Sequence, residues 1–105
     1  MIQHLVLFKL RPEVDEERIE WMMRETRMRL LKIPEVLAVR CGKRIPADQD
    51  WPFFLAVEVE STEKLALYLE DANHIKFRDE VIQPWVSERL ALDFEMEPGR
   101  DVRYS

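Results

Sequence analysis

The sequence has little cysteine and little glycine: one cysteine and two glycines occur among its 105 residues. A single cysteine, Cys41, cannot form an intrachain disulfide and cannot supply an all-cysteine metal site. Two glycines disfavour the long flexible or phosphate-cradling loops of glycine-rich motifs. The sequence also lacks G-x-S-x-G and H-E-x-x-H, which argues against a serine hydrolase and a zinc protease. We therefore expect no metal and no cofactor.

Long apolar runs are absent too. No stretch approaches the roughly 20 apolar residues of a membrane-spanning helix, and no basic segment followed by an apolar one opens the sequence. Positive charge is not in excess, because the formal net charge is −5. A negative net charge disfavours nonspecific binding to nucleic acid. These absences predict a cytoplasmic protein with no membrane and no nucleic-acid partner.

The residues that are present are typical of one soluble globular domain, with 47% hydrophobic and 35% charged residues. Asp15, Ser61 or Thr62, and Asn73 are the expected helix caps. Periodicity predicts strands and helices along the chain. The strands are expected over 2–10, 35–45, 53–61 and 88–96, and the helical segments over 16–33, 63–70 and 74–82. The second and third strands should form a hairpin, and 97–105 a polar tail.

This order of elements predicts an α+β, ferredoxin-like βαββαβ fold, in which a four-stranded antiparallel sheet carries its helices on one face. Apolar residues nevertheless occupy both faces of the first predicted strand, where Leu5 and Leu7 alternate with Val6 and Phe8. A helix-free apolar face would be an exposed patch on a monomer. We therefore expect a homodimer that packs through its sheet faces.

A histidine interrupts one apolar row of the first strand. His4 alternates with Val6 and Phe8, in the row that should face the helices. A buried histidine needs a hydrogen-bond partner, and a bond to the end of a helix is a common structural solution. The only other histidine is His74. The pair therefore allows two interpretations, a structural one and a functional one.

The chain opens on MIQHLVLFKL and continues with KIPEVLAVRCGK, YLEDANHIKF and ERLALDF. In this order and spacing, the four stretches resemble the stress-responsive dimeric α/β-barrel (Dabb) domain family. The resemblance covers residues 1–96, which we take as the domain. It implies a ferredoxin-like fold paired through its sheets as a dimeric α/β barrel. Many family members have no established activity, plant members are linked to stress responses, and the family includes olivetolic acid cyclase-like polyketide cyclases.

The resemblance also implies candidate catalytic residues. In the polyketide cyclases, a tyrosine and a histidine six residues later perform acid–base chemistry in a cavity between sheet and helices. Tyr68 and His74 match that pair, and His4 matches a histidine on the first strand. The chain has Asp-Ala at 71–72, where the family commonly has His-Pro. The expected apolar wall for a substrate consists of Val6, Phe8, Phe77 and Trp85.

The chemistry of these residue types suits proton transfer. His74 lies near a helix N-terminus, whose positive dipole end favours a neutral imidazole that can accept a proton. Tyr68 can donate a hydrogen bond to a developing enolate oxygen. We expect cofactor-independent, lyase- or cyclase-like acid–base chemistry on an enolisable carbonyl or polyketide-like compound. The alternative is a noncatalytic stress-linked dimer or ligand-binding module. Dimeric α/β-barrel monooxygenases that handle haem or quinols share the fold, and fold alone does not assign chemistry.

Overall fold

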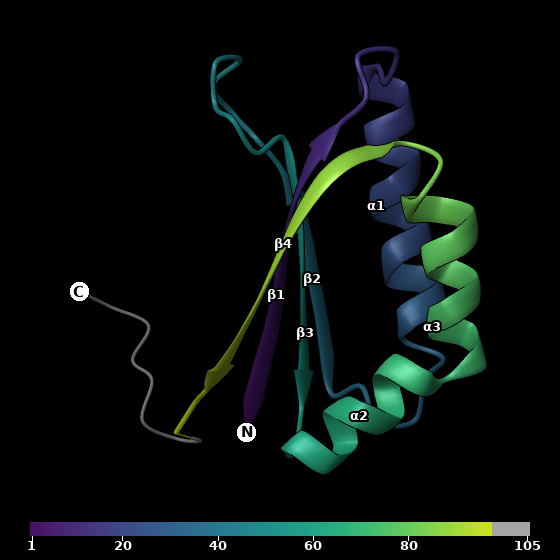
Figure 1. Cartoon of the computed structure of the whole chain (residues 1–105), viewed down its shortest axis with the longest axis vertical. Helices are drawn as coiled ribbons and strands as arrows, with labels where there is room; N and C mark the ends of the chain where they lie inside the picture. The colour runs from purple at the N-terminus through teal and green to yellow at the C-terminus, as the bar shows by residue number, and fades with distance from the viewer. Residues whose placement is uncertain (98–105) are drawn as a thin grey trace.

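The computed structural model describes residues 1–97. The strands form one antiparallel sheet in the order β2-β3-β1-β4, and the helices cover a single face of it (Figure 1). The elements are β1 (Ile2–Leu10), α1 (Glu16–Leu30), β2 (Ala38–Lys43), β3 (Phe53–Val59), α2 (Thr62–Glu70), α3 (Ala72–Phe77), the π-helical stretch η1 (Arg78–Ile82) and β4 (Val86–Glu95). The predicted ferredoxin-like α+β fold is confirmed. Of the tail expected at 97–105, residues 98–105 lie outside the described residues.

The central strand β1 pairs with β3 on one side and with β4 on the other, and β2 and β3 form the predicted hairpin. In this register His4 lies opposite Val57 of β3 and Asp93 of β4. Leu5 lies opposite Ala56 and Leu92. Because neighbours across a sheet point to the same face, the register decides which side chains His4 can reach.

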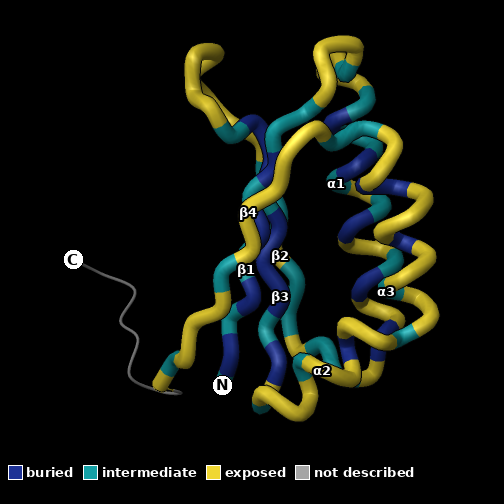
Figure 2. The backbone as a smooth tube through the Cα atoms, in the orientation of Figure 1, coloured by how far each residue is buried: buried dark blue, intermediate teal, exposed yellow. Residues whose placement is uncertain are grey.

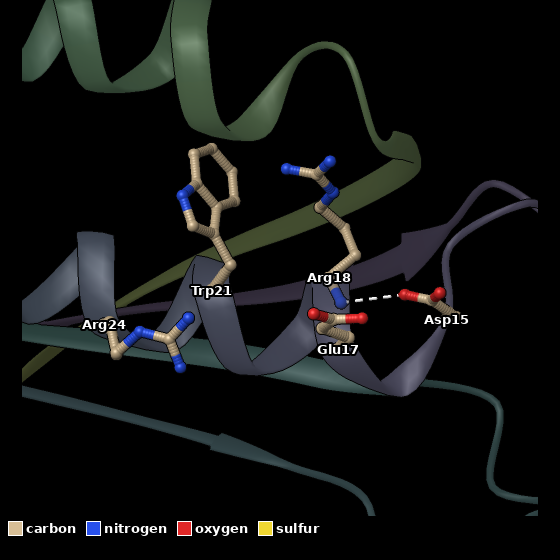
Figure 3. Close-up of a pocket in the computed structure, with 5 residues that line it drawn as sticks. All are labelled: Asp15, Glu17, Arg18, Trp21 and Arg24. Carbon is tan, nitrogen blue, oxygen red and sulfur yellow. Dashed lines mark hydrogen bonds between the residues drawn. The ribbon is translucent and has the colours of Figure 1, made fainter.

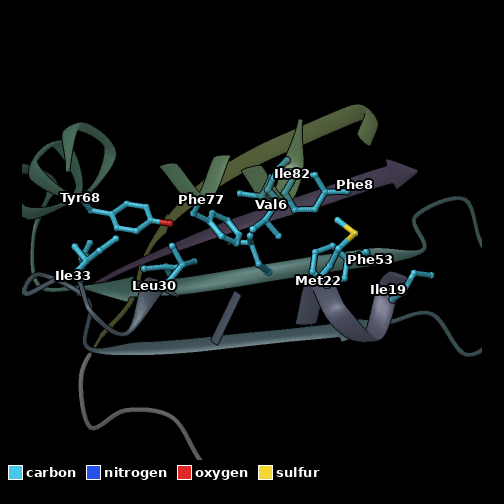
Figure 4. Close-up of a cluster of buried hydrophobic side chains, with 14 of the residues drawn as sticks. Val6, Phe8, Ile19, Met22, Leu30, Ile33, Phe53, Tyr68, Phe77 and Ile82 are labelled. Carbon is cyan, nitrogen blue, oxygen red and sulfur yellow. The ribbon is translucent and has the colours of Figure 1, made fainter. Parts of the chain in front are cut away.

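The core lies between the helices and the covered face of the sheet. Burial alternates along β1, where the even-numbered residues from Ile2 to Phe8 are buried, as expected from the pattern. Figure 2 shows buried residues running along β1 and β3 and along the inner side of α1. Figure 4 shows the large side chains that fill this layer, among them Phe8, Met22, Leu30, Phe53 and Phe77. Beside this layer, α2 packs against β1 and β3, and α3 packs against α1 and α2.

Several element boundaries differ from the prediction. The first helix ends at Leu30, not at residue 33, because Pro34 has no N–H to donate to the Leu30 carbonyl and disfavours helical backbone at Ile33. The cap of α3 is Asp71, not Asn73: the Asp71 carboxylate accepts a hydrogen bond from the backbone N–H of Asn73 at 2.7 Å. Asp15 and Ser61 cap α1 and α2 as expected.

The helix-free face of the sheet is apolar. Leu7 lies opposite Phe54 on one side and Leu90 on the other. Leu90 is 40% exposed and Phe94 is 50% exposed. We call this surface the open face and define it by seven residues: Leu5, Leu7, Phe54, Ala56, Leu90, Leu92 and Phe94. A further copy of the sheet would remove it from water.

Candidate functional site

A pocket of about 230 Å³ lies between the covered face of the sheet and the segment from α2 to η1. Of the residues expected from the sequence, His4, Tyr68, His74, Val6, Phe8 and Phe77 line it. The remaining lining residues are Leu55, Leu69, Arg78, Ile82, Arg89, Ala91 and Asp93. The structure therefore brings the expected tyrosine and both histidines together around one space, with apolar residues beside them.

His4 finds its hydrogen-bond partner on the neighbouring strand. Its Nδ1 lies 2.6 Å from Oδ1 of Asp93, although the two residues are 89 positions apart in the chain. A carboxylate only accepts hydrogen bonds, so Nδ1 carries a proton and donates it to Asp93. The histidine is buried, whereas the Asp93 side chain is half exposed. The partner is a strand carboxylate rather than a helix end.

His74 is held by the backbone of α2. It lies in the first turn of α3, as predicted, and its Nδ1 lies 3.1 Å from the carbonyl oxygen of Leu69. A carbonyl oxygen can only accept, so Nδ1–H is the donor and Nε2 is the free acceptor of a neutral ring. Burial lowers the pKa of His74 below its ordinary 6.5, and nearby His4, Arg78 and Arg89 lower it further, against the opposing effect of the Leu69 carbonyl.

Tyr68 lies between the two histidines. Its ring centroid is 4.6 Å from that of His74 and 6.0 Å from that of His4. Within residues 1–97, its hydroxyl has no hydrogen-bond partner, and Figure 4 shows the hydroxyl directed to the side where Phe77 lies. Burial raises the pKa of Tyr68 well above its ordinary 10.0. The phenol is therefore protonated at neutral pH and available to donate to a ligand.

Trp85 does not line this pocket. Its ring lies under the guanidinium of Arg18, at 4.1 Å from the ring centroid, and the same guanidinium lies 4.8 Å from the centroid of Trp21. Figure 3 shows Arg18 and Trp21 extending from the same side of α1, beside a separate hollow of about 330 Å³. Trp85 lies in the connection between η1 and β4. From there its indole packs against Arg18 of α1 in a cation–π contact.

Three charged residues of the pocket were missed at the sequence level: Arg78, Arg89 and Asp93. Strand alternation places Arg89 and Asp93 on the same side of β4. That side faces the helices because Asp93 pairs with His4. Arg89 and Asp93 could therefore be assigned to the pocket only from the pairing register of β1 and β4, and no sequence motif indicates them. Arg78 follows His74 by four residues, one helical turn further along the same face.

Metal ligands do not gather in the described part of the chain. Among residues 1–97, no three His, Cys, Asp or Glu side chains are grouped so that they could hold a metal ion. The only cysteine, Cys41, donates to the Met23 carbonyl at 3.5 Å, and burial raises the pKa of its thiol. None of the helices within the same residues has the length and hydropathy of a membrane span.

A family model described as the stress responsive A/B barrel domain, Dabb, matches residues 2–96. The chain belongs to the Dabb family. This confirms the resemblance carried by the four sequence stretches. Among curated proteins, no sequence match was found.

Solved structures with the same fold include the following three. A Dabb family protein from Mesorhizobium loti has 20% identity and a TM-score of 0.78, with 91% of this chain and 96% of that chain covered. A dimeric ferredoxin-like protein of unknown function from Thermobifida fusca has 20% identity, a TM-score of 0.80 and 90% coverage of both chains. A hydroxynitrile lyase from Passiflora edulis has 11% identity and a TM-score of 0.78, covering 92% of this chain and 94% of that chain. At these identities the likeness shows the fold alone.

Proposed function

We propose that the pocket catalyses cofactor-independent acid–base chemistry on a small enolisable carbonyl compound, of polyketide-like or related structure. The observation that supports this most strongly is the hydrogen bond from His74 to the Leu69 carbonyl. This bond fixes the tautomer in which Nε2 has a free lone pair, and the lowered pKa keeps the ring neutral near pH 7. A neutral imidazole beside a protonated phenol is a base next to a hydrogen-bond donor.

The proposed step is an enolisation. Nε2 of His74 takes a proton from the carbon next to the carbonyl, the C–H electron pair forms a C=C bond, and the carbonyl π pair moves onto oxygen. Tyr68 donates a hydrogen bond to that oxygen as its charge develops. The oxygen pair then re-forms the C=O bond while the C=C pair takes a proton back from the His74 imidazolium onto the same carbon; this restores the neutral ring, and in D₂O the returned proton is a deuteron. His4, held by Asp93 at 2.6 Å, lines the same pocket and is assigned the part of a proton relay in this proposal.

Two further properties belong to the same proposal. The first is a cytoplasmic homodimer packed through the open face, which would make the pair of sheets a dimeric α/β barrel. The apolar character of the open face and the dimeric relative with the same fold support this assembly. The second is lyase-like chemistry. The hydroxynitrile lyase supports it in one respect, because it shows that this fold can contain a lyase site.

Deuterium uptake tests the chemistry without knowledge of the natural substrate. We expect the protein in D₂O to speed the loss of α-proton NMR signals from phenylpyruvate, 4-phenylbutan-2-one or both, relative to buffer alone. Both probes have an enolisable position on an apolar body of a size suited to the pocket of about 230 Å³. Binding of the probes with exchange no faster than in buffer would contradict the enzymatic proposal and favour a noncatalytic ligand-binding module.

A further inference from the structure

Two arginines lie together at one end of the pocket. Arg78 of η1 and Arg89 of β4 line it, and both also line an adjoining hollow with Gln83, Ser87 and Glu88. Both arginines are exposed, so they form the rim between the pocket and solvent. A pair of guanidinium groups at this rim is notable in a chain whose formal net charge is −5.

One of these arginines, Arg89, has no ion-pair partner within residues 1–97, because the nearby charged side chains pair with other residues. Arg78 donates from Nε to Asp79 at 3.1 Å, and Glu88 pairs with Lys9 at 3.2 Å. Among residues 1–97, Arg89 has neither an ion pair nor a side-chain hydrogen bond. Its five N–H donors are therefore available to an incoming anion.

The one carboxylate inside the pocket lies at the other end. Arg89 is paired in register with Phe8, and Asp93 is paired with His4. Four residues along a strand correspond to about 13 Å, and Asp93 already accepts a hydrogen bond from His4 at 2.6 Å. The pocket thus has a cationic rim, an apolar middle formed by residues such as Val6 and Ala91, and a histidine–tyrosine end.

We propose that this pocket selects carboxylates: the substrate is a small keto acid whose carboxylate binds Arg89 and Arg78 while its apolar body extends toward Tyr68 and His74. Arginine suits this task because its planar fork matches the two oxygens of a carboxylate. The inference rests on the proposed function, which it narrows from enolisable carbonyl compounds to those that carry an anionic group at one end. Arg89 is then a specificity-determining residue.

Calorimetry with matched ligand pairs tests this proposal. The probes are phenylacetate, 3-phenylpropanoate and 4-phenylbutanoate, each compared with its primary amide, which has the same shape and no charge. For the wild-type protein we expect at least one carboxylate to bind roughly ten- to a hundredfold more tightly than its amide. Arg89→Gln should remove this preference and leave amide binding unchanged. Arg24→Gln, an exposed arginine of α1 outside the pocket, is the charge-matched control and should keep it.

Each other outcome has a distinct meaning. Equal binding of carboxylates and amides by the wild-type protein, or a preference that survives both Arg89→Gln and Arg78→Gln, would overturn the carboxylate inference while the proposed enolisation stands. Failure of all six probes to bind would overturn both. Faster α-proton exchange is a separate readout, so its absence alone bears only on catalysis. Raising the salt from about 50 mM to about 500 mM should weaken carboxylate binding and not amide binding.

Discussion

Replacing His74 with glutamine is expected to lower the rate of catalysed α-proton exchange by about 10²- to 10⁴-fold, the usual contribution of a positioned general base. Glutamine can still donate a hydrogen bond to the Leu69 carbonyl, which His74 Nδ1 contacts at 3.1 Å, but it has no basic nitrogen. Stability should therefore change little while the rate falls. The measurement is deuterium uptake by NMR for both proteins, with urea unfolding to compare their stability.

The pH dependence of exchange provides an internal check on this assignment. Burial, followed by nearby positive charges, lowers the pKa of His74 below 6.5. The active, neutral form is thus already the majority at pH 6.5 and increases further above it, and the rate should fall as the pH drops through the lowered pKa. Tyr68 has a pKa raised by burial, so its donor form persists and the rate should stay level up to at least about pH 9. A rate that declines between pH 8 and 7 would contradict the role of His74.

Tyr68→Phe is the companion variant. It removes only a hydroxyl that has no hydrogen-bond partner within residues 1–97, so the buried ring continues to fill its place in the core. Loss of rate without loss of stability would identify the hydroxyl as a donor to substrate. An unchanged rate would remove Tyr68 from the mechanism and leave it a role in packing alone.

Replacing Leu90 with aspartate is expected to dissociate the proposed homodimer. Leu90 is 40% exposed in the single chain and lies on the open face opposite Leu7, so a charge there is tolerated by the monomer. In a sheet-to-sheet interface the same charge would be buried without a partner, which weakens association by roughly a hundredfold or more. Light scattering at micromolar concentration should give about twice 12.7 kDa for the wild-type chain and about 12.7 kDa for the variant.

Met28→Asp is the matched control for this experiment. Met28 is 58% exposed and belongs to α1, on the helical side of the molecule. The Met28→Asp variant introduces the same charge at a similarly exposed apolar position, and its dimer should remain intact. A monomeric wild-type chain would rule out the assembly through the open face. Dissociation by both variants would indicate an interface that includes the helices.

The layered fold could be predicted from short-range patterns because each strand carries its own alternation. In β1, the buried even-numbered residues match the row predicted to face the helices. The ends of helices were harder to predict, because Asp71 and Asn73 are both good caps and the choice depends on how the chain leaves α2. Pro34 marked a stop for α1, but the helix ended a turn earlier.

Only some residues of the candidate site could be predicted from the sequence, and the reason is physical. His4, Tyr68 and His74 could be named from a resemblance, but the partner of His4 depends on the register between β1 and β4, whose residues 4 and 93 are far apart in sequence. The charge at the rim depends on the same register, through Arg89. Trp85 was expected in the pocket wall because it is aromatic and follows the helical segment that carries His74. The sequence does not show in which direction its indole points, and in the structure it packs on Arg18.

The protonation state of His74 decides whether the pocket contains a general base at neutral pH. Long-range ¹H–¹⁵N NMR of the histidine rings at pH 7 distinguishes the two neutral tautomers from the imidazolium ion. We expect a neutral His74 ring with its proton on Nδ1, bound to the Leu69 carbonyl, and an unprotonated Nε2 whose titration midpoint lies below pH 6.5. A proton on Nε2, or a ring still charged at pH 7, would leave the pocket without its base and contradict the proposed chemistry.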